Sequence, residues 1–224
     1  MTTKPTKEQE TKITKLEELP MKKFELTEDT RLLCGTTLFR IRALISFADV
    51  RKGDLGGWVE KEENLSQENN SWVYDDACVF ENGRVTGNSR VSGNGQVSGY
   101  SRVSGNSQVS ENSCVFGNSH VAENGLVAGN SRVSGYSRVT GNSHVSGNSR
   151  ISGNGQVDGD SRVSGNSCVF GNSLVTGNSR VSGNSLVSGD SQVYGNGRVS
   201  GCARVFANGR VSGNSLVTDD AKVF

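Results

Sequence analysis

The sequence is poor in the residues that usually build a globular core. Hydrophobic residues make up 33% and aromatic residues 6% of its 224 residues, and only two prolines occur. A conventional domain of this length would contain more leucine, isoleucine and phenylalanine. Low hydrophobicity favours disorder, but a disordered chain does not keep a strict apolar period. This chain keeps one, so we expect a folded protein of unusual architecture.

Long apolar runs and an excess of one charge are also absent. The formal net charge is +1, and residues 71–224 contain 12 Lys and Arg against 10 Asp and Glu. This balance is too small for a nucleic-acid-binding protein. No apolar run approaches the roughly 18 residues of a membrane span. The segment 1–20 lacks the apolar core of a secretion signal. We therefore expect neither a membrane partner nor a nucleic-acid partner.

A β-branched residue occupies every sixth position from Val73 to Val223, and all of these are valine except Ile151. The consensus unit is V-S-G-N-S-R. A period of six fits neither a helix nor a simple strand, but it fits a short strand followed by a corner. Valine suits the buried centre of the strand. Gly-Asn suits the corner because both residues tolerate positive φ. The small residue two positions before each valine should face inward, and the two neighbours of valine should face outward.

The number of units in one coil follows from the irregular positions. Phenylalanine follows valine at five places, namely Phe80, Phe116, Phe170, Phe206 and Phe224. Every interval between successive members of this set is a multiple of eighteen, which predicts three six-residue units per coil. The predicted fold class is all-β, a single-chain triangular β-solenoid with 18 residues per coil and about 8 to 9 coils. At about 4.8 Å between stacked strands, the prism is roughly 40 Å long.

From about Val73 to Phe224 the chain resembles the left-handed β-helix, or hexapeptide-repeat, proteins. Their units carry an aliphatic residue and, four positions later, a small residue, as at Val85 and Ser89. The glycine departs from that pattern by one position, as at Gly87, so left-handedness is what the resemblance implies. The chain is also similar to bacterial and prophage proteins that join a short N-terminal element to V-x-G-N-[SA]-x repeats. Some of those proteins are labelled as transferases.

Three segments follow from these patterns. Residues 1–20 are rich in lysine and glutamate and are predicted to be a flexible tail. Apolar and polar residues alternate from Phe24 to Leu44 around a turn at Cys34-Gly35-Thr36, which predicts a β-hairpin. Residues 21–70 are therefore predicted to be a cap built on this hairpin, with a separate binding head as the alternative. Residues 71–224 are the solenoid, whose end needs a cap.

The phenylalanine column is the first candidate surface. If the residue after each valine faces outward, Phe80, Phe116, Phe170, Phe206 and Phe224 form a stripe on one flat face. Exposed apolar stripes mark interfaces. We expect the N-terminal tail, a sister subunit or a foreign protein to cover it; the remaining alternative is that the phenylalanines are scattered without a role. An open strand edge at the end of the solenoid also favours self-association, so a homo-oligomer is expected.

A column of arginines is the second candidate surface. Arg162, Arg180 and Arg198 fall in consecutive coils, with His144 one coil before them. Stacked guanidinium groups repel one another unless an anion intervenes. The column is therefore either a docking strip for an acidic surface or phosphate, or a solvated row of side chains that fan apart.

The five cysteines predict neither a disulfide nor a metal site. Cys78 and Cys114 lie two coils apart, about 9.6 Å along the stack, whereas a disulfide needs Cα atoms within about 7 Å. The sequence contains no C-x-x-C pair, so no zinc site is expected. Unpaired thiols indicate a reducing compartment, which we take to be the cytoplasm of a bacterial or phage-infected cell.

His120 and His144 are the only histidines. The resemblance implies a role for them, because hexapeptide-family acyltransferases use a histidine as general base and bind acyl-CoA between neighbouring subunits. Those enzymes have loops that leave the coil, and residues 73–224 contain none.

The leading expectation is therefore a non-catalytic, rod-like scaffold without cofactor. It would bind a host protein or itself, as a phage or prophage accessory factor or inhibitor. An acyltransferase that uses acyl-CoA is the alternative. Ice binding would need regular threonine ladders, and Thr86, Thr140 and Thr176 are too sparse.

Overall fold

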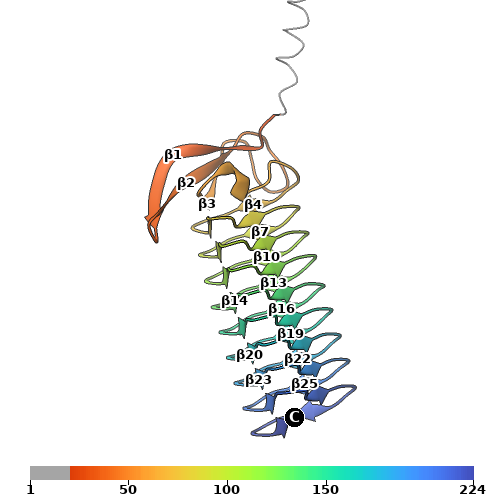
Figure 1. Cartoon of the computed structure of the whole chain (residues 1–224). Helices are drawn as coiled ribbons and strands as arrows, with labels where there is room; N and C mark the ends of the chain where they lie inside the picture. The colour runs from red at the N-terminus through yellow and green to blue at the C-terminus, as the bar shows by residue number, and fades with distance from the viewer. Residues whose placement is uncertain (1–20) are drawn as a thin grey trace, which may run out of the picture.

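The computed structural model describes residues 21–224, and the predicted tail of residues 1–20 lies outside this range. The described chain is a stack of triangular coils that carries a small N-terminal cap at one end (Figure 1). Each repeat strand pairs in parallel with the equivalent strands one coil before and one coil after it, as Val109 does with Val91 and Val127. The predicted all-β solenoid with 18-residue coils is confirmed. Its architecture fits the left-handed β-helix that the resemblance implies.

Three sheets form the three faces of the prism. The 12-stranded sheet, called the Phe face, contains β1 (Phe24–Leu33), β2 (Thr36–Ala43), β3 (Leu55–Val59), β5 (Cys78–Val79), β8 (Gln96–Val97), β11 (Cys114–Val115), β14 (Arg132–Val133), β17 (Arg150–Ile151), β20 (Cys168–Val169), β23 (Leu186–Val187), β26 (Arg204–Val205) and β29 (Lys222–Val223). The 9-stranded sheet, called the His144 face, contains β4 (Trp72–Val73), β7 (Arg90–Val91), β10 (Gln108–Val109), β13 (Leu126–Val127), β16 (His144–Val145), β19 (Arg162–Val163), β22 (Arg180–Val181), β25 (Arg198–Val199) and β28 (Leu216–Val217). The 8-stranded sheet, called the His120 face, contains β6 (Arg84–Val85), β9 (Arg102–Val103), β12 (His120–Val121), β15 (Arg138–Val139), β18 (Gln156–Val157), β21 (Leu174–Val175), β24 (Gln192–Val193) and β27 (Arg210–Val211).

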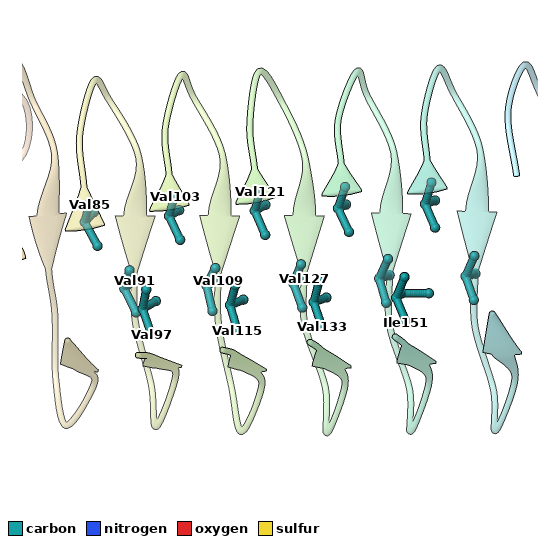
Figure 2. Close-up of a cluster of buried hydrophobic side chains, with 14 of the residues drawn as sticks. Val85, Val91, Val97, Val103, Val109, Val115, Val121, Val127, Val133 and Ile151 are labelled. Atoms are coloured by element: carbon teal, nitrogen blue, oxygen red, sulfur yellow. The ribbon is translucent and has the colours of Figure 1, made fainter. Parts of the chain in front are cut away.

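The core is a column of valines that runs along the centre of the prism. Figure 2 shows these side chains pointing inward from the three strands of successive coils. From Val73 to Val205 every repeat valine, and Ile151, is fully buried. From Ser71 to Gly209 the small residue two positions before valine is buried as well, as predicted. Where it is serine, its hydroxyl donates to backbone carbonyls: Ser113 Oγ lies 2.6 Å from Ser110 O and 3.1 Å from Val127 O. These bonds satisfy a polar group that would otherwise be costly to bury.

Gly and Asn both tolerate positive φ, but the two residues take different conformations at the corners. Only the first corner residue takes a positive φ, which lies between +59° and +75° for the corner glycines. Acidic residues also take this conformation at some corners, as Glu123 does with φ +60°. The Glu123 carboxylate accepts a hydrogen bond of 3.0 Å from Gly141 N, one coil later.

The asparagines form ladders along the corners of the prism. Many of these side chains donate to the asparagine one coil later, as Asn94 does to Asn112 (2.9 Å) and Asn112 to Asn130 (3.1 Å). Asparagine therefore follows glycine because its amide both donates and accepts along the stack.

The cap contains the predicted hairpin, in which β1 and β2 pair antiparallel around Cys34 and Gly35. An irregular first coil follows: Val59 pairs with Val79 and Leu65 bridges to Val85, with the 3₁₀ helix η1 (Glu62–Asn64) between them. Val59 and Leu65, six residues apart, therefore begin the stack.

Candidate functional site

The phenylalanine column does not form one continuous exposed stripe. Phe80 is 8% exposed, because it packs with Leu38, Trp58 and Leu33 of the cap. Phe116 and Phe170 are each 41% exposed. At the end of the column the rings of Phe206 and Phe224 meet with centroids 4.2 Å apart. The cap thus covers the first member, and a partner for Phe116 and Phe170 stays a prediction.

The cysteines of this face are free thiols. Cys78 is buried beside the guanidinium of Arg31, which donates to its sulfur. Burial raises the pKa of the Cys78 thiol, and the charge of Arg31 opposes that rise. Burial also raises the pKa of the Cys114 thiol, and the positive charge of Arg132 opposes that rise. Both thiols are therefore held in the neutral, weakly nucleophilic form.

The predicted arginine column lies on the His144 face. His144, Arg162 and Arg180 pair in register on consecutive strands, and Arg198 follows on β25. All four side chains are exposed. The structure brings them together as predicted, while their role as an anionic docking strip stays a prediction.

A second cationic column, which the sequence analysis missed, lies on the His120 face. Arg84, Arg102, His120 and Arg138 occupy the position before valine on four consecutive strands and pair in register. We call these four residues the His120 ladder. The signal that could have found it was present, because its members recur in the sequence at the period of one coil.

His120 differs from the arginines around it by being only partly exposed. Burial lowers the pKa of its imidazole, and the positive charges of Arg102 and Arg138 lower it further. The ring is therefore neutral near pH 7, and a neutral imidazole has a nitrogen that can accept a proton.

Beside the cap, the surface of the same face has two depressions. A shallow, open depression lies between η1 and β6 and is lined by Glu63, Ser66, Arg84 and Thr86. A second depression beside it is lined by Lys61, Asn64 and again Arg84. Both depressions adjoin Arg84, the first member of the His120 ladder, so this face is uneven as well as charged.

Within residues 21–224 no helix is long and apolar enough to cross a membrane. The same part of the chain contains no group of three or more His, Cys, Asp or Glu side chains placed to hold a metal ion.

No protein-family model matches the chain. Over 81 residues the chain is 37% identical to the uncharacterized acetyltransferase YdcK of Escherichia coli (strain K12). The match covers 32% of this chain and 25% of YdcK, so the chain spans about a quarter of that relative's length. The expectation that the protein is not an enzyme is corrected by this similarity, because the relative is named as an acetyltransferase. The chain is a parallel β-solenoid that resembles the hexapeptide-repeat proteins, and over part of its length it is similar to one protein named as an acetyltransferase.

Proposed function

We propose that the protein is an acyltransferase that moves an acetyl group from acetyl-CoA to a hydroxyl or amine of an acceptor. The observation that carries this proposal is the similarity to an acetyltransferase over a third of the chain. The fold supports it as well, since the resemblance to hexapeptide-repeat proteins implies the same chemistry.

His120 is the residue best suited to act as general base. Its imidazole is kept neutral by burial and by Arg102 and Arg138, so it can take the proton of the acceptor as the acceptor attacks the thioester carbonyl. The bond from carbonyl carbon to sulfur then breaks, and the imidazolium returns the proton to the departing thiolate. His144 has a more exposed side chain at the end of its column and is the matched comparison.

A pocket that binds the acyl donor needs a second wall. Residues 73–224 form strands and corners from which no loop leaves the coil, and the depressions beside Arg84 are shallow. We therefore propose that the active form is a homo-oligomer in which a second copy completes the pocket, as the resemblance implies. A host-protein partner, an inhibitor role and a phage origin stay predictions. The five free thiols support a cytoplasmic location.

The test measures acetyl-CoA consumption by His120→Gln and His144→Gln with a panel of sugar and amine acceptors. Glutamine occupies the column of His120 at Gln156 and the column of His144 at Gln108, so the fold should survive both changes. We expect His120→Gln to lower kcat by about 10²-fold or more, while His144→Gln retains activity. In the wild type, kcat/KM should fall as pH drops through the pKa of His120. Absence of acetyl-CoA binding in calorimetry, or equal activity of both variants and wild type, would overturn the proposal.

A further inference from the structure

Two tyrosines stand at the corner that leads into the His120 face. Tyr100 and Tyr136 are 66% and 68% exposed. Each lies two positions before an arginine of the His120 ladder, in the segments Y-S-R that end at Arg102 and Arg138. The serine between them is fully buried, so the tyrosine and the arginine leave the backbone on the outer side. The two segments are two coils apart, about 9.6 Å.

The solenoid itself does not require tyrosine at this corner position. The equivalent residues elsewhere are asparagines that donate to one another, as Asn154 does to Asn172 at 2.8 Å on this same corner. Tyr100 and Tyr136 interrupt that ladder, and Asn118 between them has no asparagine one coil away on either side. Two largely exposed rings bury little area in return. Their presence is therefore better explained by a contact outside the chain than by folding.

The arginines of the His120 ladder beside them are not neutralised by ion pairs. Within residues 21–224, Arg84, Arg102 and Arg138 form no ion pair, whereas Arg31 and Arg90 do. Cationic groups about 4.8 Å apart repel one another. A row of anions along the ladder would relieve this repulsion. The face is therefore complementary to a ligand with regularly spaced negative charges.

We infer that the His120 face binds a linear acidic polysaccharide with one carboxylate per sugar, a polyuronate. One sugar of an extended chain is about as long as one coil spacing, and every second carboxylate of a two-fold chain projects from the same side. These carboxylates would meet every second member of the ladder, such as Arg102 and Arg138. Tyr100 and Tyr136 would then lie two sugars apart, where their rings can stack on the apolar faces of the sugars. This inference goes beyond acetyl transfer and does not depend on it.

His120 gives such binding a pH dependence. The charged groups around it are Arg102 and Arg138 on the neighbouring strands and Glu123 at the following corner, whose carboxylate is held by Gly141 N. A bound row of carboxylates favours the imidazolium, so affinity should increase as pH falls from 7 to 5.5. Uronate carboxylates remain ionised over that range.

The first experiment is calorimetric titration of the full chain with a hexameric galacturonate at low salt, without acetyl-CoA. The variant is the double substitution Tyr100→Asn, Tyr136→Asn, which installs the residue that the corner carries elsewhere. We expect binding weaker by roughly tenfold, as for the loss of two aromatic contacts. The melting temperature should be unchanged or higher, because Asn118 gains two asparagine neighbours.

A matched pair of charge variants separates this site from general electrostatic attraction. Arg102→Gln with Arg138→Gln and Arg162→Gln with Arg180→Gln remove the same charge from different faces, and glutamine occurs naturally in both columns. The first pair should abolish measurable binding, and the second should leave the affinity within about twofold. Four results would overturn the inference: no galacturonate binding by the wild type, equal losses in both pairs, equal binding of a neutral oligosaccharide, or tighter binding of an oligothymidylate of the same charge. Because acetyl-CoA is absent, none of these results bears on acetyl transfer.

Discussion

Replacing Gly165 by alanine tests whether the corners control the spacing between coils. Gly165 has φ +72°, and a Cβ there would lie 2.7 Å from Gly183 O and 2.9 Å from Gly183 N. The left-handed conformation costs a residue with a Cβ about 1–2 kcal/mol. Contact with the backbone of the next coil adds about 1 kcal/mol or more, because backbone cannot move aside as a side chain can. We expect the free energy of unfolding to fall by about 2–3 kcal/mol.

Gly155→Ala is the matched control. Gly155 occupies the inward position before Val157, has no positive φ, and the nearest contacts of an added Cβ are 3.1 Å from Ser152 O and 3.2 Å from Val169 O. Alanine already fills the equivalent inward position of the repeat on the Phe face, at Ala203, which is fully buried. The tight contacts destabilise the folded chain. Alanine also restricts the unfolded chain, which raises the free energy of unfolding by about 0.4–1 kcal/mol. The two effects should leave the stability within about 0.5 kcal/mol of wild type.

The assay is thermal unfolding followed by far-ultraviolet circular dichroism. For a chain of this size Gly165→Ala should lower the melting temperature by roughly 5–10 °C, and Gly155→Ala by no more than roughly 2 °C. Glu123 takes φ +60° between two coils, so a side chain at this kind of corner still permits folding. Equal melting temperatures for the two variants would refute the argument that corner geometry limits the stack.

Three further predictions concern the cap, the ladders and the Phe face. Burial lowers the pKa of Lys23 to about 8, so the folded chain loses this proton before the unfolded chain does, and stability should rise between about pH 8 and 10.5 by on the order of 3 kcal/mol. A Lys23→Met variant should lack that rise in urea titrations, and parallel profiles would contradict it. Asn130→Ala removes a bond from Asn112 and one to Asn148 and should cost about 1 kcal/mol, whereas Asn118→Ala should cost less than about 0.5 kcal/mol; equal costs would count against the ladder. If the Phe face holds subunits together, Phe116→Ser with Phe170→Ser should convert an oligomer to a monomer in light scattering, and an unchanged mass would exclude that face.

The sequence predicted the solenoid because one geometric constraint repeats along it. The valine at every sixth position determines the unit of strand and corner. The recurrence of phenylalanine at multiples of eighteen residues determines the length of the coil. Register followed directly, and Val109 lies between Val91 and Val127 as the period requires. Tertiary neighbours in such a stack are fixed by sequence separation, which is not so in most folds.

The parts that escaped prediction depend on contacts that no period determines. The hairpin turns back over Phe80, and nothing in the alternation of β1 and β2 specifies that direction. The His120 ladder did obey the period, but His120 was considered as an isolated histidine and not with Arg102 and Arg138. The pKa of its imidazole is lowered by burial and then by those two charges, and both causes became visible only when the strands were stacked.

The composition of the cap follows from the polarity of the stack. Outside the two-residue strands, each coil donates its backbone N–H groups to the carbonyls of the next coil, as Asn94 N does to Glu111 O. The end nearest the N-terminus therefore presents carbonyl groups that no coil can satisfy. The cap supplies donors to them: Trp58 N to Ala77 O, Asn64 Nδ2 to Gly83 O and Lys23 Nζ to Ser71 O, each at 2.9 Å.

An entirely apolar cover over this end would bury those carbonyls unpaired, at about 1–3 kcal/mol each. Apolar side chains such as Phe24 and Trp72 seal the valine column, with ring centroids 6.2 Å apart, but they have no donors for the carbonyls. A long side chain with three N–H bonds reaches several carbonyls from one position, as Lys23 does with Ser71, Glu68 and Asn69. The polarity of the hydrogen-bond ladder thus explains why a lysine is among the most buried residues of a cap whose main task is to cover valine.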